Sequence, residues 1–284
     1  MLQPAFQIIN QELSEEDLSQ SRLLIDVGPS YFSYVLFSMK KMTPSVVKSY
    51  AIEPSPGQNW LEALKIVIDH DENLAREYSE TFLVYNFPES NLVPGKFFSL
   101  PINKQLTELV YGDLPRGLIL NEKIPWWDIH NVYRIPVEVH EFLLQKFRTG
   151  KYWHYYSLLL KSFKMFNAKE MPEIIKVNFF SSSMVVMIFR NEQLQLIQTF
   201  PFTDSRDVSY HLLNCSRLLM LNLQDVMVQV AGLVDRQSAI YTELYKYFGE
   251  ISFDELDDTF RFHDDTAAYP RHYFSSLLKM AVCV

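Results

Sequence analysis

The stretch RLLIDVGPSYFSYVLFS, residues 22–38, decides how the rest of the chain is interpreted. Two runs of strand-forming residues flank the turn signal Pro29-Ser30, so the stretch predicts a β-hairpin. Asp26 and Gly28 form an Asp-x-Gly pattern at the end of the first run. Glycine lets backbone N–H groups approach an anion closely, and such a turn can hold phosphate groups. The stretch therefore predicts a hairpin and a candidate nucleotide site.

The composition is that of a folded protein without a nucleic-acid or secretory signature. The 284 residues are 48% apolar, which excludes a disordered chain. The formal charge is −8 and the 26 basic residues form no long cluster, so we expect no nucleic-acid partner. The first residues do not resemble a signal peptide, and no apolar run has membrane-spanning length. Together with only two cysteines, these features predict a soluble cytoplasmic protein.

The order of predicted elements occurs twice along the chain. In the first half, three strands are predicted at residues 23–28, 31–39 and 46–53. A helix that begins after Asn59 and a fourth strand at residues 81–87 follow them. The second half predicts the same order and one more helix, at residues 174–180, 184–190, 193–200, 204–221, 226–232 and 236–248. IDVGPSYFSYVLF lies over VNFFSSSMVVMIF without a gap, so Asp26 corresponds to Asn178 and Gly28 to Phe180. We therefore predict a duplicated β-β-β-α-β-α unit.

The repeat divides the α/β chain into an arm and two lobes. Residues 1–21 are predicted to be a polar N-terminal arm, residues 22–150 lobe one and residues 151–284 lobe two. Lobe one carries an inserted subdomain at about residues 88–135.

Several stretches carry a resemblance to a known family. The tandem unit that opens with Asp-x-Gly looks like the actin-like ATPase (RNase H-like) superfamily. ELSEEDL, NLVPGKFF, TFPFTDSRDVSYHLL and YPRHYFSSLLKMAVC resemble an uncharacterised bacterial domain-of-unknown-function family assigned to that superfamily. The resemblance covers essentially the whole chain and implies a two-lobed actin-like fold. Its motifs are structural, so it implies no activity.

The phosphate-binding residues implied by the superfamily are only partly present. Asp26, Gly28 and Ser30 match the first hairpin, but Pro29 removes a backbone donor. In the second hairpin Asn178 and Phe180 replace Asp and Gly, and the hydroxyls of residues 181–183, Ser182 among them, remain. The adenosine-binding part usually carries a Gly-Gly pair, where this chain has Gly232 alone. Asp26, Gly28, Ser30, Ser182 and Gly232 are thus weak nucleotide-binding candidates, with turn geometry as the competing explanation.

Other chemistry finds little support in the residues. An RNase H-type nuclease needs a carboxylate on the strand at residues 81–87, which offers Asn86 instead. The His-Asp stretches near residues 70 and 263 lack a second ligand cluster, so we predict no metal site and no catalytic residue. A small-molecule regulator that reuses the interlobe cleft for a ligand without phosphates stays open.

Aromatic residues concentrate in the predicted insert. Trp126, Trp127 and Tyr133 are candidates for a partner-binding surface, because Trp and Tyr anchor interfaces, although core packing would also use them. We therefore predict a non-catalytic protein-binding or scaffolding module with degenerate phosphate loops, a protein partner and no cofactor; a homo-oligomer is compatible with this function. The alternative is a divergent ATPase that binds Mg-ATP in the interlobe cleft.

Overall fold

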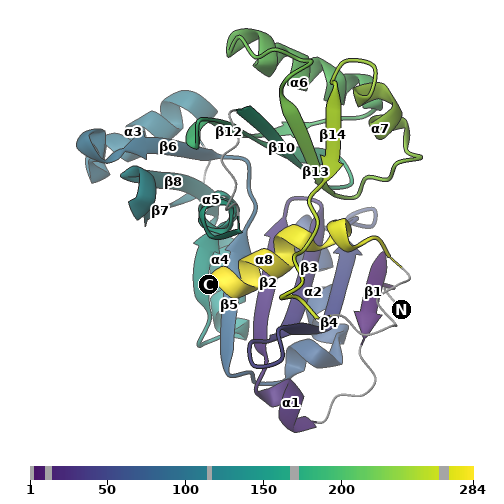
Figure 1. Cartoon of the computed structure of the whole chain (residues 1–284). Helices are drawn as coiled ribbons and strands as arrows, with labels where there is room; N and C mark the ends of the chain where they lie inside the picture. Colours follow the sequence, from purple (N-terminus) through teal and green to yellow (C-terminus); the bar gives the residue numbers. More distant parts are fainter. Residues whose placement is uncertain (1–2, 10–14, 114–116, 167–172, 262–268) are drawn as a thin grey trace. The chain divides into compact units, whose positions relative to one another are not determined.

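The structure is a computed structural model, which describes residues 3–9, 15–113, 117–166, 173–261 and 269–284 (Figure 1). The chain forms two compact units. Unit 1 comprises Met1–Lys164, Phe260–Asp265 and Met280–Val284, and unit 2 comprises Met165–Thr259 and Thr266–Lys279. The last helix, α8 (Ser275–Cys283), is divided between them.

Unit 1 is built on a six-stranded sheet in the order β1-β4-β3-β2-β5-β9. Its strands are β1 (Phe6–Ile9), β2 (Arg22–Gly28), β3 (Tyr31–Ser38), β4 (Thr43–Ala51), β5 (Glu80–Tyr85) and β9 (Lys151–His154). Every residue of β2 after Arg22 is buried, as expected for a central strand between two covered faces. The arm predicted for residues 1–21 contributes the edge strand β1, which pairs antiparallel with β4, and the short helix α1 (Glu15–Ser19).

Helix α2 (Trp60–His70) begins where the sequence predicts it. Asn59 accepts a hydrogen bond from the Glu62 N–H, and the Glu62 side chain accepts one from the Asn59 N–H. This reciprocal capping box satisfies two N–H groups that the helix cannot pair internally. Leu64, Val67 and Ile68 of α2 then pack into the core that the sheet forms.

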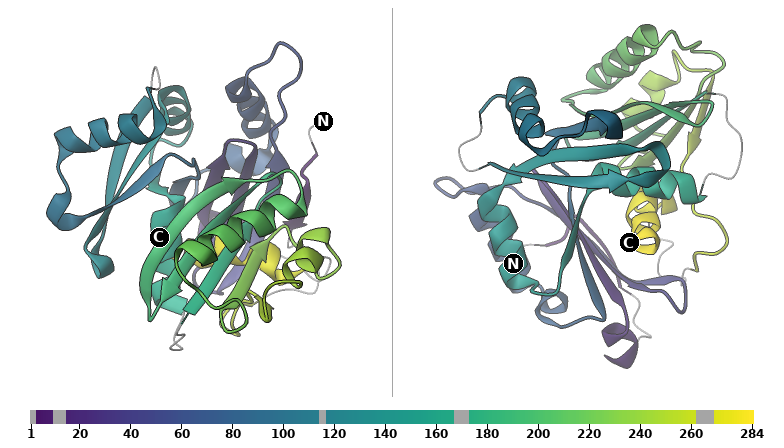
Figure 2. Two further views of the ribbon diagram at one scale, coloured as in Figure 1. Left: turned by 90° about the horizontal axis from the view of Figure 1, so that it is seen from above. Right: turned by 90° about the vertical axis from the view of Figure 1, so that its left-hand side faces the viewer.

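The insert of unit 1 is a three-stranded sheet with one helix. Its strands are β6 (Ser90–Pro94), β7 (Gly117–Ile124) and β8 (Ile129–Pro136), in the order β6-β8-β7. The short helical turns η2 (Gly95–Phe97) and η3 (Pro125–Trp127) follow β6 and β7. Helix α3 (Leu100–Tyr111) lies along one face of this sheet, at the left of Figure 2's left view. The strands of the insert thus lie between Ser90 and Pro136.

After the insert, helix α4 (Val137–Lys146), strand β9 and helix α5 (Tyr155–Phe166) complete unit 1. Strand β9 pairs in parallel with β5, with Phe82 opposite Lys151. This pairing attaches the segment after residue 150 to the first sheet, and unit 1 continues to Lys164.

Unit 2 has the same strand order as unit 1 without the insert. The order is β12-β11-β10-β13-β14. Its strands are β10 (Glu173–Phe179), β11 (Ser183–Arg190), β12 (Gln193–Pro201), β13 (Met227–Gly232) and β14 (Glu250–Phe253), and its helices are α6 (Ser205–Leu218), α7 (Ala239–Leu244) and the first part of α8. Strands β4-β3-β2-β5-β9 correspond to this order one for one. The predicted duplicated unit and two-lobed α/β fold are confirmed.

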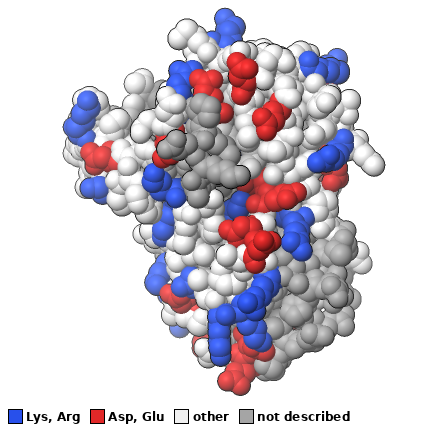
Figure 3. Space-filling view, viewed as in Figure 1, with Lys and Arg blue, Asp and Glu red and all other residues white. Residues whose placement is uncertain are grey.

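Two features of the molecule bear on its environment. Among the described residues, none of the helices is both long and apolar enough to span a bilayer. On the face shown in Figure 3, Lys and Arg side chains are interspersed with Asp and Glu side chains.

Candidate functional site

The first hairpin places an aromatic side chain where a phosphate would have to approach. Gly28 and Tyr31 face each other across the two-residue turn between β2 and β3. A Cβ atom built on Gly28 would lie 2.2 Å from Cε1 of Tyr31. The Tyr31 ring therefore lies directly on the glycine, a packing that recurs where an aromatic residue pairs with glycine across strands. Gly28 is needed to admit this ring.

The Tyr31 hydroxyl reaches the side chain of Asp26. The hydroxyl oxygen lies 3.0 and 2.9 Å from the two carboxyl oxygens, and Asn86 Nδ2 donates to the same hydroxyl at 2.5 Å. Tyr31, Asp26 and Asn86 are all buried. The three side chains form a closed polar cluster between β2, β3 and the end of β5, which satisfies the hydrogen-bonding capacity that burial would otherwise make costly.

The surroundings of Asp26 keep it neutral. Burial raises the pKa of Asp26 to about 8, and the hydrogen bond from Tyr31 lowers it only in part. Burial and the nearby Asp26 raise the pKa of Tyr31 well above its usual value. Burial in this cluster therefore favours the protonated carboxyl form of Asp26, whereas a magnesium ligand or a group that orders Mg²⁺-bound water must be a carboxylate. These residues do not fit a magnesium–nucleotide site.

The turn itself is held by backbone contacts. Pro29 is exposed and has no N–H to offer, while the Ser30 carbonyl accepts a hydrogen bond of 2.9 Å from the Ile52 N–H. The backbone of Ser30 thus joins the hairpin turn to Ile52, the residue that follows β4.

The second hairpin, in unit 2, has the register expected from the gap-free superposition. The Phe180 N–H donates to the Ser183 carbonyl at 2.8 Å, so Phe180 and Ser183 occupy the places of Gly28 and Tyr31. In the first hairpin the small residue, Gly28, ends the first strand and the aromatic Tyr31 begins the second. In the second hairpin the aromatic Phe180 follows the first strand and the small Ser183 begins the second. Ser182 is exposed, and its carbonyl accepts from the Phe202 N–H at 3.0 Å.

Helix α8 contacts the face of unit 2 that carries Asn178. The Ser276 hydroxyl lies 3.3 Å from Asn178 Oδ1. Near it, the Asp254 carboxylate lies 3.2 Å from Lys176 Nζ and 2.9 Å from Lys279 Nζ, and all three side chains are largely buried. The two ammonium groups hold the pKa of Asp254 below its usual value despite its burial. This cluster fastens α8 to the sheet of unit 2.

Gly232 has a conformational role. Its φ of +78° lies in the region that favours glycine, and a Cβ atom there would lie 2.1 Å from the Phe179 carbonyl oxygen. The same carbonyl accepts a hydrogen bond of 2.9 Å from Leu233. Gly232 therefore lets the end of β13 close against β10.

The three aromatic candidates of the insert lie in different environments. Trp126 is 52% exposed, Trp127 is half-buried, and Tyr133 is fully buried. The Tyr133 hydroxyl donates to Glu122 at 2.6 Å, and the His154 N–H donates to the same carboxyl oxygen at 2.7 Å. Tyr133 therefore packs in the core of unit 1, and of the three only Trp126 presents a largely exposed ring.

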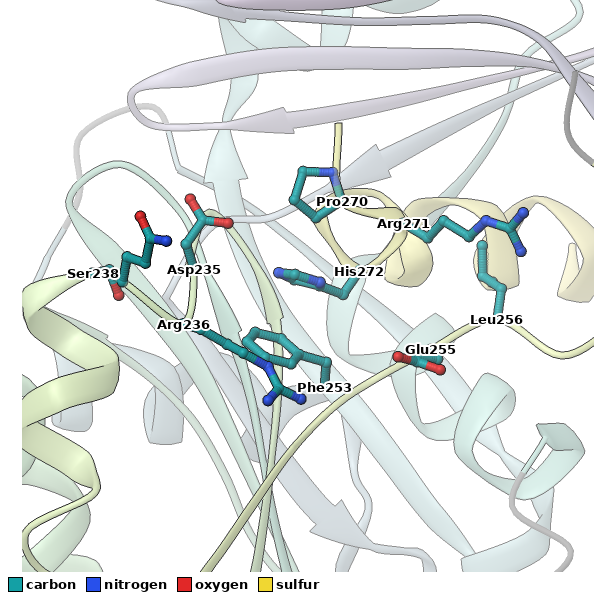
Figure 4. Close-up of a pocket in the computed structure, with 10 residues that line it drawn as sticks. Asp235, Arg236, Ser238, Phe253, Glu255, Leu256, Pro270, Arg271 and His272 are labelled. Atoms are coloured by element: carbon teal, nitrogen blue, oxygen red, sulfur yellow. The ribbon is translucent and has the colours of Figure 1, made fainter. Parts of the chain in front are cut away.

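A cavity of about 730 Å³ lies within unit 2 (Figure 4). Arg236 lies over the Phe253 ring at 5.6 Å, and the His272 ring lies 4.1 Å from the same ring, centre to centre. His272 Nε2 is 2.6 Å from the Val234 carbonyl oxygen, which fixes the imidazole. Tyr241 also stacks on Phe253, at 5.6 Å. The Phe253 ring is already in contact with Tyr241, His272 and Arg236, so it offers little free surface to a ligand. The groups left for a ligand are mainly charged side chains that line the cavity, such as Asp235, Glu255 and Arg271.

Within the part of the chain that the structure describes, no three His, Cys, Asp or Glu side chains are grouped so that they could hold a metal ion. Cys215 and Cys283 are buried, and burial raises the pKa of Cys215.

The sequence interpretation missed Tyr31, which is the residue that defines the first hairpin. The signal was present, because a two-residue turn at Pro29-Ser30 places Tyr31 opposite Gly28. Asn86 was noted only as a missing carboxylate, yet it donates to the Tyr31 hydroxyl.

A family model described as "Protein of unknown function (DUF3822)" matches residues 10–251. The chain belongs to this family. The predicted resemblance to a domain-of-unknown-function family is confirmed. No curated protein is significantly similar to the chain.

Solved structures with the same fold are distant in sequence. A Bacteroides thetaiotaomicron protein with actin-like ATPase fold and unknown function is 14% identical, with a TM-score of 0.73 over 94% of this chain and 98% of that one. The PilM–PilN type IV pilus biogenesis complex contains a chain 12% identical, with a TM-score of 0.58 over 94% of this chain and 98% of that one. Ethanolamine utilization protein EutJ from Carboxydothermus hydrogenoformans is 9% identical, with a TM-score of 0.50 over 98% and 93% of the two chains. At these identities the similarity establishes the actin-like ATPase fold alone.

Proposed function

We propose that this DUF3822 protein is a non-catalytic, protein-binding module that uses an actin-like ATPase fold as a scaffold. The observation that carries the proposal is the position of Tyr31, whose ring lies on Gly28 and whose hydroxyl bonds Asp26. A phosphate group needs the backbone N–H groups beside such a glycine and a cation held by a carboxylate. In unit 1 the Tyr31 ring occupies the space beside Gly28 that a phosphate would need. The carboxyl group that would hold the cation is Asp26, and burial favours its neutral form.

The second hairpin supports the same conclusion independently. Phe180 stands at the position of the glycine, and Asn178 is engaged by Ser276. Neither hairpin offers the combination of glycine and free carboxylate that ATP chemistry in this fold relies on. The proposal therefore includes no cofactor and no catalytic residue.

Protein binding is a function that requires no nucleotide chemistry. One structure with this fold belongs to a PilM–PilN type IV pilus biogenesis complex, which supports a role in which such a fold binds a protein partner. In the present chain the exposed Trp126 of the insert is the favoured anchor, because a largely exposed Trp is uncommon on a surface that binds nothing. A sequence with only two cysteines favours a cytoplasmic location, where disulfide frameworks are rare.

Calorimetric titration of the full chain with Mg-ATP and Mg-ADP at pH 7 tests the proposal. We expect no binding tighter than roughly 100 μM, which corresponds to about −5.5 kcal/mol. Tighter binding that Asp26→Ala abolishes would contradict it, because the carboxyl group would then be serving the nucleotide. Circular dichroism of both proteins excludes unfolding as the reason for a missing signal.

A further inference from the structure

The two fully buried residues of helix α3 in the insert are uncharged and polar, whereas several of its apolar residues are exposed. Asn103 and Thr107 are 3% and 0% exposed, whereas Ile102, Leu109 and Val110 are 56%, 83% and 54% exposed. A surface helix that packs on a sheet normally buries its apolar stripe. The arrangement in α3 is the reverse of the one that a helix exposed to water on its outer side would adopt.

The layer beneath α3 is poorly satisfied as well. Neither Asn103 Nδ2 nor Asn103 Oδ1 has a hydrogen-bond partner among the described residues, and the same holds for Asn91 Nδ2 and His130 Nδ1 on the strands. Asn91, on β6, and His130, on β8, lie on the same face of the sheet, since β6 and β8 pair Asn91 with Val132 and Val93 with His130. Buried polar atoms without partners cost free energy. Burying Asn103 in place of an apolar residue of α3 thus costs free energy. Contacts within the insert therefore do not explain why the apolar residues of α3 are exposed to solvent.

Three exposed apolar residues of α3, together with the half-buried Leu106, form a stripe. Ile102, Leu106, Leu109 and Val110 are spaced i, i+4, i+7 and i+8, which places them on one side of the helix. The stripe contains no charged residue, and the ion pair between Lys104 and Glu108, 3.6 Å apart, lies on a different side. A surface of this kind has the pattern that helices use to dock into an apolar partner surface.

Further exposed apolar side chains lie near the start of α3. Leu100 is its first residue, Phe97 is in η2, and Trp126 is in η3. The two turns are joined by a hydrogen bond of 2.7 Å from the Gly95 N–H to the Asp128 carbonyl. We call the following residues the α3 patch: Phe97, Leu100, Ile102, Leu109, Val110 and Trp126, which are 52–83% exposed.

The size of the α3 patch matches one half of a symmetric dimer. With roughly 60–120 Å² for a buried aliphatic side chain and 150–250 Å² for an aromatic one, the patch exposes about 450 Å². Two copies would bury about 900 Å² of apolar surface. Because apolar atoms make up about 60% of a typical interface, the whole interface would measure about 1,500 Å², the standard size for a specific complex.

We infer that the α3 patch is a self-association surface through which two copies of this chain form a two-fold symmetric dimer. In such an interface the same patch serves both partners, so an uncharged, apolar stripe is complementary to itself. A chain with a formal charge of −8 repels its own copies at charged surfaces, and the stripe avoids that repulsion. The inference rests on the proposed function, because it names the partner of the insert.

Sedimentation analysis of the full chain at about 1 to 100 μM tests the inference, since this range spans the dissociation constants expected for such an interface. We expect the wild type to approach twice its 33.4 kDa mass as concentration rises. Leu109→Glu places a charge in the stripe and should weaken the dimer at least about tenfold. Val110→Glu repeats the test at a second position, and Gln105→Glu is the control, because it makes a similar change at an exposed polar position of α3.

A wild type that stays monomeric throughout the range would overturn the inference, as would equal association of the wild type and both stripe variants. Binding of a different protein to a monomeric chain would assign the patch to that protein and equally refute self-association. Neither outcome changes the calorimetric result for Mg-ATP, so failure of the inference is distinguishable from failure of the proposed function.

Discussion

Replacing Asp26 with asparagine is expected to remove a pH dependence of stability that the wild type carries. The pKa of Asp26 is about 8 in the folded protein, against an ordinary value of 3.8 that applies to the unfolded chain. Between these two values the folded state holds a proton that the unfolded state has released. The free energy of unfolding of the wild type therefore falls as pH rises, by about 1.4 kcal/mol per pH unit from this group alone.

From pH 5.5 to pH 7.5 the loss amounts to about 2.5 kcal/mol, a large part of the 5–15 kcal/mol that stabilises a typical domain. Asparagine has nearly the same shape as a protonated aspartate, and its Oδ1 can accept the bond that the Tyr31 hydroxyl now donates at 2.9–3.0 Å. The substitution thus removes the titration and keeps the cluster.

Urea unfolding of wild type and Asp26→Asn at pH 5.5, 6.5 and 7.5 measures the effect. We expect the variant to gain stability relative to the wild type as pH rises, by about 2.5 kcal/mol over the range. Other groups with shifted pKa values, such as Glu122 at about 7 and His154 at about 4, titrate in both proteins and cancel in the difference. Parallel curves for the two proteins would refute the reasoning, because Asp26 would then be ionised in the folded state and available to a cation.

Two further substitutions test the packing of the hairpin and of α8. Gly28→Ala places a Cβ atom 2.2 Å from the Tyr31 ring and should cost about 1–3 kcal/mol of stability in urea unfolding, but clearly less when Tyr31 is alanine as well. Asp254→Asn leaves two buried ammonium groups without their carboxylate and should cost about 3–5 kcal/mol at pH 7. Because the pKa of Asp254 is lowered in the folded state, this cost should shrink as pH falls below 4, and a cost independent of pH would contradict the assignment.

The repeated order of elements could be predicted because it depends on local patterns. Central strands such as β2 and β10 are rich in branched apolar residues, and α2 begins at a capping box that the sequence displays. The gap-free superposition of the two hairpins agrees with the structure, where both hairpins have a two-residue turn and corresponding cross-strand pairs. The pairing of Tyr31 with Gly28 that this turn imposes was not predicted.

Features that depend on which side a residue faces could not be predicted in the same way. Trp126 and Tyr133 are both aromatic residues of the insert, but Trp126 lies in the exposed turn η3, whereas Tyr133 points from β8 into the core. Likewise, a strand after residue 150 pairs with β5, a non-local contact with no signal in the segment itself. The raised pKa of Asp26 follows from burial in the folded chain, which the local sequence does not reveal.

The two hairpins differ from the expected phosphate site in different ways. In unit 1 the glycine is present and Tyr31 covers it; in unit 2 the aromatic Phe180 replaces the glycine and the small Ser183 stands opposite. Each cross-strand pair thus combines one aromatic and one small side chain, which together fill the end of the hairpin. In unit 1 the ring also supplies the hydroxyl that Asp26 needs in its buried position. Restoring a phosphate loop there would therefore require removing Tyr31 and re-solvating Asp26 together, because either change alone leaves an uncompensated buried group or a filled site. The hairpin is accordingly a stable structural element in its own right, which fits a protein whose function lies on its surface.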